Sequence, residues 1–217
     1  MEQNSDLEVI LSNSASPIDH EHIRRVHELL TAIKGRAEGS GIHGFLKKYF
    51  CELFGLERGA GSIIVLGYRD EHEEYVDGTM NKSPFRGNPV SIYDPCAIDL
   101  LYQTTQGKED DGAVLITPDG MIINTGTLLE VTPKRLLGEL DIPNHRDIAE
   151  KYGFAENVGT RHLHSIAASY RMPDTTIFTL SGSTGHIRVY ERMKIIYSPF
   201  PEEVQTPQKT RARLLAA

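Results

Sequence analysis

The sequence predicts a protein of the α/β class, in which helices flank a central β-sheet and an N-terminal helical extension comes first. Three observations support this prediction. Apolar residues recur at helical spacing early in the chain, short β-rich runs begin at residue 61, and helical segments then alternate with these runs. We divide the chain into a helical extension (1–57), a main α/β domain (58–198) and a C-terminal tail (199–217).

Two amphipathic helices are expected in the extension. Ser16 and Pro17 form a helix start, and apolar residues follow at helical spacing as far as Gly35. The second helix is expected after residue 41. The apolar faces of both helices must pack on the main domain or on another subunit. The apolar face of the second helix consists of Ile42, Phe45, Leu46, Tyr49, Phe50, Leu53 and Phe54.

The main domain is expected to begin with a buried central strand at residues 61–67, which form a nearly continuous apolar run. A helix is expected from Asp94 to Gly107, and a hairpin at 113–125 turns at Pro118-Asp119-Gly120. Residues 199–217 show no sustained apolar pattern and are expected to be loosely held. Further helices are expected within 132–158 and at 159–170, and further strands at 175–181, 186–190 and 194–198.

The composition excludes several classes of protein. The net charge is −7, so nothing favours binding to nucleic acid. Cys51 and Cys96 are the only cysteines, too few for a disulfide framework or a four-cysteine zinc site. No run of about 18 apolar residues and no signal peptide occurs, so we expect no membrane partner and a cytoplasmic location.

Three segments have the features of phosphate-binding sites. The first is Asp110-Asp111-Gly112-Ala113, which places carboxylates where a loop enters a buried strand. The second, Gly159-Thr160-Arg161-His162, opens a helix whose N-terminus can hold an anion. The third, residues 181–185 (Ser-Gly-Ser-Thr-Gly), joins two strands. This third segment is either a phosphate-contacting loop or a tight hairpin turn.

The order of these three segments resembles the diadenylate cyclase domain of the DNA integrity scanning protein and its relatives. The resemblance covers roughly residues 57 to 198, and Asp-Gly-Ala followed by Thr-Arg-His is its most specific part. Residues 61–66 followed by residues 73–79 are also similar to the first hairpin of that family. The resemblance implies a central mixed β-sheet flanked by helices.

The resemblance also implies an activity and a set of site residues. Each subunit would bind one ATP, and two subunits would face each other in a homodimer or higher homo-oligomer to form cyclic di-AMP. Asp111 would bind a divalent metal ion, Mn²⁺ or Mg²⁺, and would be catalytic together with Arg161 and His162. The residues implied to bind ATP are Gly112, Ala113, Thr127, Leu128, Leu129, Gly159, Thr160, Arg161, His162, Ser181, Ser183 and Thr184.

The chain departs from the family pattern at three places. Asp110 replaces a histidine before Asp-Gly-Ala, Leu163 replaces a second arginine after Arg-His, and Gly182 and Ser183 replace glutamates of the turn. These departures leave open a nucleotide-binding or sensor domain of the same fold that does not convert its ligand. An α/β scaffold that binds no nucleotide is a third interpretation.

Overall fold

The architecture of the chain comes from a computed structural model. The structure describes residues 2–38, 61–77, 83–85, 87–106, 112–140 and 148–204. The helix expected after residue 41 and the acidic residues 109–111 lie outside these ranges.

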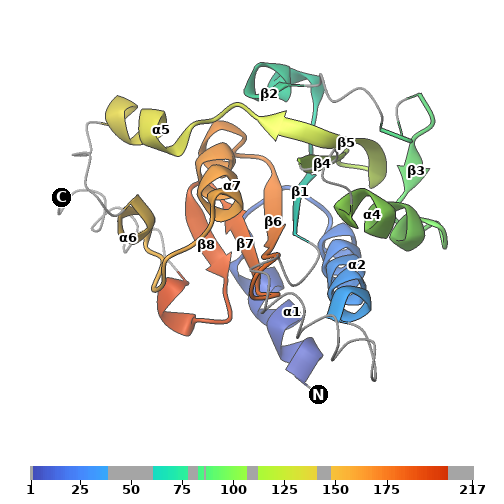
Figure 1. Ribbon diagram of the computed structural model, residues 1–217, viewed down its shortest axis with the longest axis horizontal. Coiled ribbons are helices and arrows are strands. Elements are labelled where there is room, and N and C mark those ends of the chain that lie inside the picture. Colours follow the sequence, from blue (N-terminus) through green and yellow to red (C-terminus); the bar gives the residue numbers. More distant parts are fainter. Residues whose placement is uncertain are drawn as a thin grey trace, which may run out of the picture.

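The described strands form one eight-stranded sheet in the order β2-β5-β4-β1-β6-β7-β8, with β3 paired to β5 (Figure 1). β1 and β4 run parallel, whereas the other pairs are antiparallel. The predicted mixed sheet is therefore confirmed. The strands are β1 (Ser62–Leu66), β2 (Val76–Asp77), β3 (Val90–Ser91), β4 (Ala113–Ile116), β5 (Met121–Leu129), β6 (Thr176–Leu180), β7 (Ile187–Glu191) and β8 (Lys194–Tyr197).

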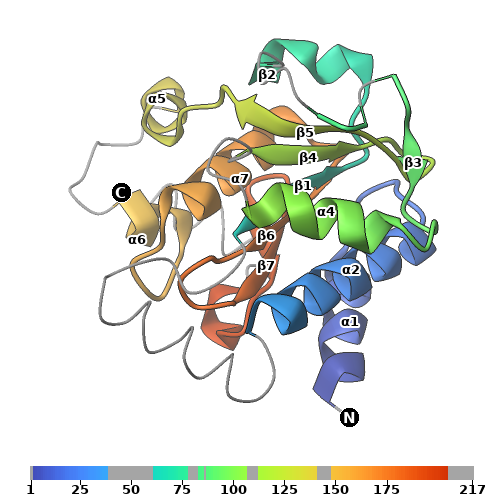
Figure 2. The same ribbon diagram turned by 45° about the vertical axis from the view of Figure 1, so that its right-hand side comes forward.

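Helices cover both faces of this sheet. Figure 2 shows α2 and α4 in front of the strands and α7 behind them. Within the described part of the chain, no helix is both long enough and apolar enough to cross a lipid bilayer. The α-helices are α1 (Glu2–Asn13), α2 (His20–Glu38), α4 (Ala97–Gln106), α5 (Pro133–Glu139), α6 (Ile148–Tyr152) and α7 (Thr160–Arg171), and the 3₁₀ helices are η1 (Asp70–Tyr75) and η3 (Pro201–Glu203).

The central strand β1 divides the apolar interior into two cores. Successive side chains of a strand point to opposite faces. Ile64 and Leu66 accordingly belong to the core that α1, α2 and α4 cover. Ile63 and Val65 belong to the core that α5, α6 and α7 cover. A continuous apolar run is what a strand buried on both faces requires, so the prediction for residues 61–67 is confirmed.

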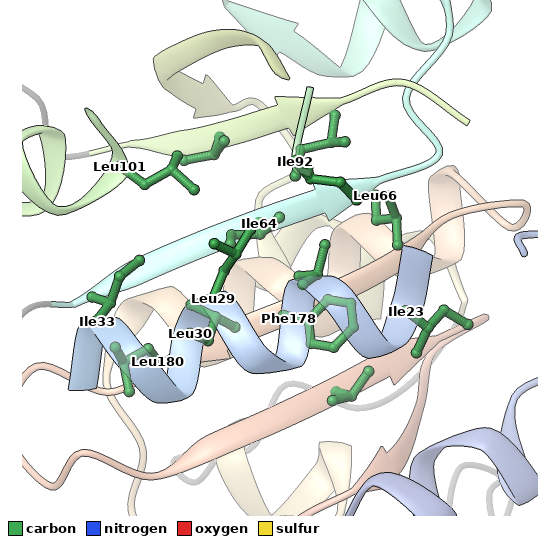
Figure 3. Packing of buried hydrophobic residues seen from close by; sticks show 14 of the residues in the cluster. Ile23, Leu29, Leu30, Ile33, Ile64, Leu66, Ile92, Leu101, Phe178 and Leu180 are labelled. Atoms are coloured by element: carbon green, nitrogen blue, oxygen red, sulfur yellow. The ribbon is translucent and has the colours of Figure 1, made fainter. Parts of the chain in front are cut away.

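The amphipathic face of α2 lies directly on the sheet. Leu29, Leu30 and Ile33 are almost fully buried against Ile64 of β1 and Phe178 of β6 (Figure 3). Each such side chain contributes about 1.5–3 kcal/mol through burial. The described part of the helical extension therefore shares its core with the strands. The division of the chain at residue 57 stays a prediction.

Two segments differ from the expectation. The hairpin that the family resemblance suggested between residues 61–66 and 73–79 does not form, because β4 and β6 occupy both edges of β1. Instead β2 pairs with β5, where Val76 lies opposite Leu129. α1 was not expected from the polar start of the chain, yet its Ile10 is fully buried.

The first residues of the C-terminal tail are anchored. Glu203 of η3 is fully buried and accepts hydrogen bonds from Arg188 of β7. The expectation of a loosely held tail is therefore wrong for residues 199–204. Hydrogen bonds and charge pairing hold this segment without the apolar periodicity that sequence patterns reveal.

Candidate functional site

One end of the sheet carries described residues of two of the predicted segments. Because β1 and β4 are parallel, with Ile63 opposite Ala113, their first residues lie at the same end. β6 is antiparallel to β1, so its last residue, Leu180, lies beside Ser62 at that end. Gly112 and Ser181 therefore mark the same end of the sheet, although they are distant in the sequence.

A cavity of about 290 Å³ opens at this end. Two of the three predicted segments line it, namely the start of α7 and the turn between β6 and β7. The turn is also a hairpin turn, because Ser181 and Gly185 are joined by a backbone hydrogen bond of 2.9 Å. The hairpin-turn interpretation is therefore confirmed, whereas contact of this segment with a phosphate stays a prediction. The lining residues are Gly159, Thr160, Arg161, His162, Ser181, Gly182 and Ser183.

Arg161 reaches from α7 to the beginning of β1. A methyl group added to Gly61 would lie 2.5 Å from Nη1 of Arg161, so the guanidinium group rests on the backbone of this glycine. A side chain at position 61 would displace the guanidinium group. The absence of a side chain there lets a cation lie at the end of the sheet where β1 begins.

The N-terminus of α7 adds partial positive charge to the cavity. Gly159 is the N-cap residue of this 12-residue helix, and its own lack of a side chain means that no side-chain oxygen caps the first turn. The N-terminal N–H groups of a helix and its dipole attract anions. Together with Arg161, this helix end suits a ligand that carries negative charge.

His162 is neutral and almost completely buried. Its Nδ1 lies 2.7 Å from the hydroxyl of Tyr190, while Nε2 has no hydrogen-bond partner among the described residues. Burial, as the largest cause, and the electrostatic effect of Arg188, His186 and Arg161 together lower the pKa of His162 to about 3. The ring therefore carries no charge at neutral pH, and its surroundings are electropositive.

This buried histidine makes the free energy of unfolding depend on pH. The pKa of His162 is about 3 in the folded protein, below the ordinary value of 6.5. Between these values the unfolded chain binds a proton that the folded chain excludes, so stability is full above pH 6.5 and falls as pH falls. We expect His162 to lower the free energy of unfolding by about 2 kcal/mol between pH 8 and pH 5.

Urea unfolding at the two pH values measures this loss. In His162→Gln the decrease between pH 8 and pH 5 should be smaller than in the wild type by that amount. His20→Gln, a change at an exposed position at the start of α2, is the control and should keep the full decrease. Equal decreases in the wild type and His162→Gln would contradict the assignment.

The predicted residues of β4 and β5 lie at the same end of the sheet. None of them is among the described residues that line this cavity. Gly112 packs against the backbone of β5, and Ala113 is paired with Thr127. The buried hydroxyl of Thr127 has no hydrogen-bond partner among the described residues. Leu128 is exposed and Leu129 is buried.

Thr184 supports the β6–β7 turn from within. Its N–H donates to the hydroxyl of Ser181, and its own hydroxyl accepts from the N–H of His186. It does not line the cavity that Ser181 and Ser183 line. The predicted role of Thr184 in ligand binding thus has no direct geometric support, whereas its role in the turn is clear.

Asp111, the predicted metal ligand, lies outside the described residues. Among the residues that are described, no three His, Cys, Asp or Glu side chains gather as a metal site would require. The described lining of the cavity offers hydroxyls and one imidazole but no carboxylate. A divalent metal ion therefore depends on Asp111 and its neighbours, and the metal assignment stays a prediction.

A buried ionic cluster beside the cavity was missed by the sequence analysis. Arg188 donates to both carboxylate oxygens of Glu203, at 2.7 and 3.0 Å, and to Glu156 at 2.8 Å. Glu203 also accepts from the backbone N–H of Ala155 at 2.9 Å. The cluster holds the segment that leads into α7. One signal was available: arginine is unusual in an apolar strand such as β7.

Phe154 and Phe200 enclose the cation of this cluster. The guanidinium carbon of Arg188 lies 5.7 Å from the ring centre of Phe154 and 5.2 Å from that of Phe200. Aromatic faces attract a cation and exclude water from it. Arg188 thus raises the positive potential at His162 while its own charge stays paired.

No protein-family model matches the chain. The chain is 27% identical over 119 residues to a diadenylate cyclase of Methanocaldococcus jannaschii, a match that covers 55% of this chain and 32% of the relative. The chain thus spans about a third of the length of that relative. This match supports the resemblance that the motifs indicate.

Two solved structures are similar in fold. One is a hypothetical membrane spanning protein from Bacillus cereus, with a TM-score of 0.50, 15% identity, and coverage of 88% of this chain and 67% of that chain. The other is a double mutant of DacA from Staphylococcus aureus, with a TM-score of 0.42, 15% identity, and coverage of 83% and 91%. The first supports the mixed α/β architecture.

Proposed function

We propose that this chain is a diadenylate cyclase, which condenses two ATP molecules into cyclic di-AMP and releases pyrophosphate. The observation that carries the proposal is the shared cavity of the α7 start and the β6–β7 turn, with Arg161 lying against Gly61. The sequence match to an archaeal protein named diadenylate cyclase supports it. The order of the motifs in the sequence agrees with this activity.

The cavity has the groups that a triphosphate needs. The α7 N-terminus and Arg161 supply positive charge, and Thr160, Ser181 and Ser183 supply hydroxyls. Phosphoryl transfer depends chiefly on holding the reacting groups in line and neutralising charge, so no covalent nucleophile is required. His162 does not serve as a base at neutral pH, because with a pKa of about 3 its role is that of a neutral hydrogen-bonding group.

The reaction requires two copies of the site. A cavity of about 290 Å³ lies at the lower end of the volumes of small-molecule sites and does not enclose two nucleotides. Each ribose 3′-hydroxyl must reach the α-phosphate of the other nucleotide. Two subunits that face each other bring these groups together, so we propose a homodimer or a higher homo-oligomer.

The nucleoside is proposed to lie toward β4 and β5. Gly112 and Ala113 border this side, and Thr127 contributes an unpartnered hydroxyl within the described residues. Leu128 is one of the exposed large apolar side chains, as a contact to an adenine ring requires. Leu129 lies beneath it in the core.

Asp111 is the residue that we propose to hold a divalent ion. Carboxylate oxygens are the ligands that Mg²⁺ and Mn²⁺ prefer. A bound ion of this kind would neutralise phosphate charge during the reaction. In the chain Asp111 directly precedes Gly112, which the structure places at the end of the sheet where the cavity opens.

A second candidate function is a domain that binds a nucleotide without converting it. Leu163, which stands where the family has an arginine, is packed against the core under α7. Gly182 and Ser183, which stand where the family has glutamates, line the cavity without a carboxylate. Both observations reduce the number of charged groups at the site and favour this second function.

Incubation of the purified protein with ATP and either Mn²⁺ or Mg²⁺ tests the proposal. Mass spectrometry should detect cyclic di-AMP and pyrophosphate. Asp111→Asn should lower product formation below detection while the circular dichroism spectrum and the oligomeric state stay unchanged. Asp119→Asn, an exposed carboxylate in the β4–β5 turn, is the matched control and should retain full activity.

Three outcomes decide between the candidates. Product that forms in the wild type and is lost in Asp111→Asn supports the cyclase. Tight binding of ATP in calorimetry without product supports the sensor domain. A folded protein that neither binds ATP nor forms product excludes both functions.

A further inference from the structure

Tyr190 and His162 form a buried pair behind the cavity. Tyr190 lies in β7 and is fully buried, and its hydroxyl is 2.7 Å from Nδ1 of His162 on α7. Phe154 packs against both rings, with all three centroids 6.2 or 6.4 Å apart. The imidazole ring therefore has one fixed orientation, with Nδ1 toward β7 and Nε2 away from it.

Hydrogen bonding decides which ring nitrogen carries the proton. Among the described residues, His162 Nδ1 is the partner of the Tyr190 hydroxyl, so this phenol proton has no other acceptor there. If the phenol donates to Nδ1, its proton is satisfied and Nε2 carries the hydrogen of the neutral ring. If Nδ1–H instead donated to the phenol oxygen, two buried groups would lack a hydrogen-bond partner, namely the phenol proton and Nε2. A buried polar group without a partner costs free energy. The first arrangement is therefore favoured.

The result is a neutral donor on a residue that lines the cavity. With the phenol donating to Nδ1, Nε2 bears a hydrogen that has no acceptor among the described residues. His162 is 3% exposed and lines the cavity beside Arg161. Buried polar groups without a partner are rare in folded proteins and indicate a missing ligand or water. An anionic oxygen in the cavity would supply the missing acceptor.

We propose that Tyr190 is a positioning residue that holds His162 in the Nε2–H tautomer, so that the imidazole donates a hydrogen bond to a phosphate oxygen in the cavity. This inference rests on the proposed function, because it assumes a phosphorylated ligand. Tyr190 itself touches no ligand and acts through His162. Since the donor is neutral, its hydrogen bond does not vary with pH through the neutral range.

The tautomer can be measured without any activity. In ¹⁵N-histidine-labelled protein, long-range proton–nitrogen correlation spectra distinguish the Nε2–H and Nδ1–H tautomers of neutral imidazole. His162→Gln identifies the signals by their loss. We expect wild-type His162 to be in the Nε2–H form, and Tyr190→Phe, which removes only the hydroxyl, to give a mixture of both tautomers.

Ligand affinity provides the second readout. Calorimetry with ATP and with inorganic pyrophosphate should show binding that is about three- to tenfold weaker in Tyr190→Phe than in the wild type. Tyr152→Phe is the matched control, because it removes another buried phenol, one that donates to the carbonyl of Pro133 at 3.0 Å. This control should leave both the His162 tautomer and the affinities unchanged.

Three results would overturn the inference. One is an Nδ1–H tautomer in the wild type, a second is an unchanged tautomer in Tyr190→Phe, and a third is equal affinities in the two phenylalanine variants. Failure of the proposed function has a different signature. Absence of cyclic di-AMP, together with the expected tautomers and weakened pyrophosphate binding, would reject the cyclase and support the role of Tyr190.

Discussion

Replacement of Arg188 by methionine is expected to lower the free energy of unfolding by about 3–5 kcal/mol, because Glu203 would keep a buried charge without its cation. Glu203 is fully buried, and Arg188 donates to both of its carboxylate oxygens. The two phenylalanine rings around the guanidinium group leave water little access to the site. Urea unfolding at pH 7.5 measures the loss.

Two further variants test the cause. Arg36→Met removes a cation from a surface pair with Asp99, whose side chain is 61% exposed, and should cost less than about 1 kcal/mol. Arg188→Met combined with Glu203→Leu removes both charges and should recover much of the stability. If the double variant is as unstable as the single one, the loss comes from packing and the charge explanation is wrong.

Gly112→Ala is expected to destabilise the protein by about 3 kcal/mol or more, since the new methyl group would meet backbone that has no room to move. It would lie 2.5 Å from the carbonyl carbon of Gly126 and 2.7 Å from the nitrogen of Thr127. Both atoms belong to the neighbouring strand β5. The strand would have to separate from β4 at the end of the sheet where the cavity lies.

The close approach at Gly112 has a visible cause. Ala113 is paired with Thr127, and Leu115 is paired with Asn124. Between these two pairs β4 has one residue and β5 has two, so β5 contains an additional residue. Such a bulge bends a strand locally, and Gly126 adopts the positive φ of 70° that this bend requires. The bulge presses the β5 backbone toward Gly112.

Gly35→Ala is the matched control for this prediction. It makes the same chemical change inside α2, where nothing lies within 4 Å of the new methyl group. Alanine favours a helix interior over glycine by about 0.5–1 kcal/mol, so this variant should be more stable than the wild type. Thermal unfolding should show a lower unfolding temperature for Gly112→Ala and a higher one for Gly35→Ala. If Gly112→Ala leaves the unfolding temperature unchanged, the β5 backbone moves away from the new methyl group at little cost, and the prediction is wrong.

The sequence indicates the elements of the fold through local patterns. The continuous apolar run at residues 61–67 predicts a strand buried on both faces, and the turn at 118–120 predicts the β4–β5 hairpin. Both are confirmed. α1 was missed, although Leu7, Ile10 and Leu11 recur at helical spacing. The polar residues around them hid this short pattern.

Contacts between distant segments are the part that local patterns do not reveal. The motif at Gly159 and the serine-rich turn are visible in the sequence, but their common cavity depends on the strand order of the sheet. The hydrogen bond between Tyr190 and His162 joins residues 28 positions apart. Nothing in the spacing of these two residues predicts it. The role of Asp111 stays a prediction.

The bond between β7 and η3 determines where the polypeptide can be shortened. A fragment ending at Ser198 would keep every described strand but would lose Glu203 and leave the guanidinium group of Arg188 in the interior with one carboxylate fewer. Ala155 would lose its acceptor as well, which would loosen the approach to α7. The five residues that follow Ser198, from Pro199 to Glu203, therefore belong to the minimal folding unit.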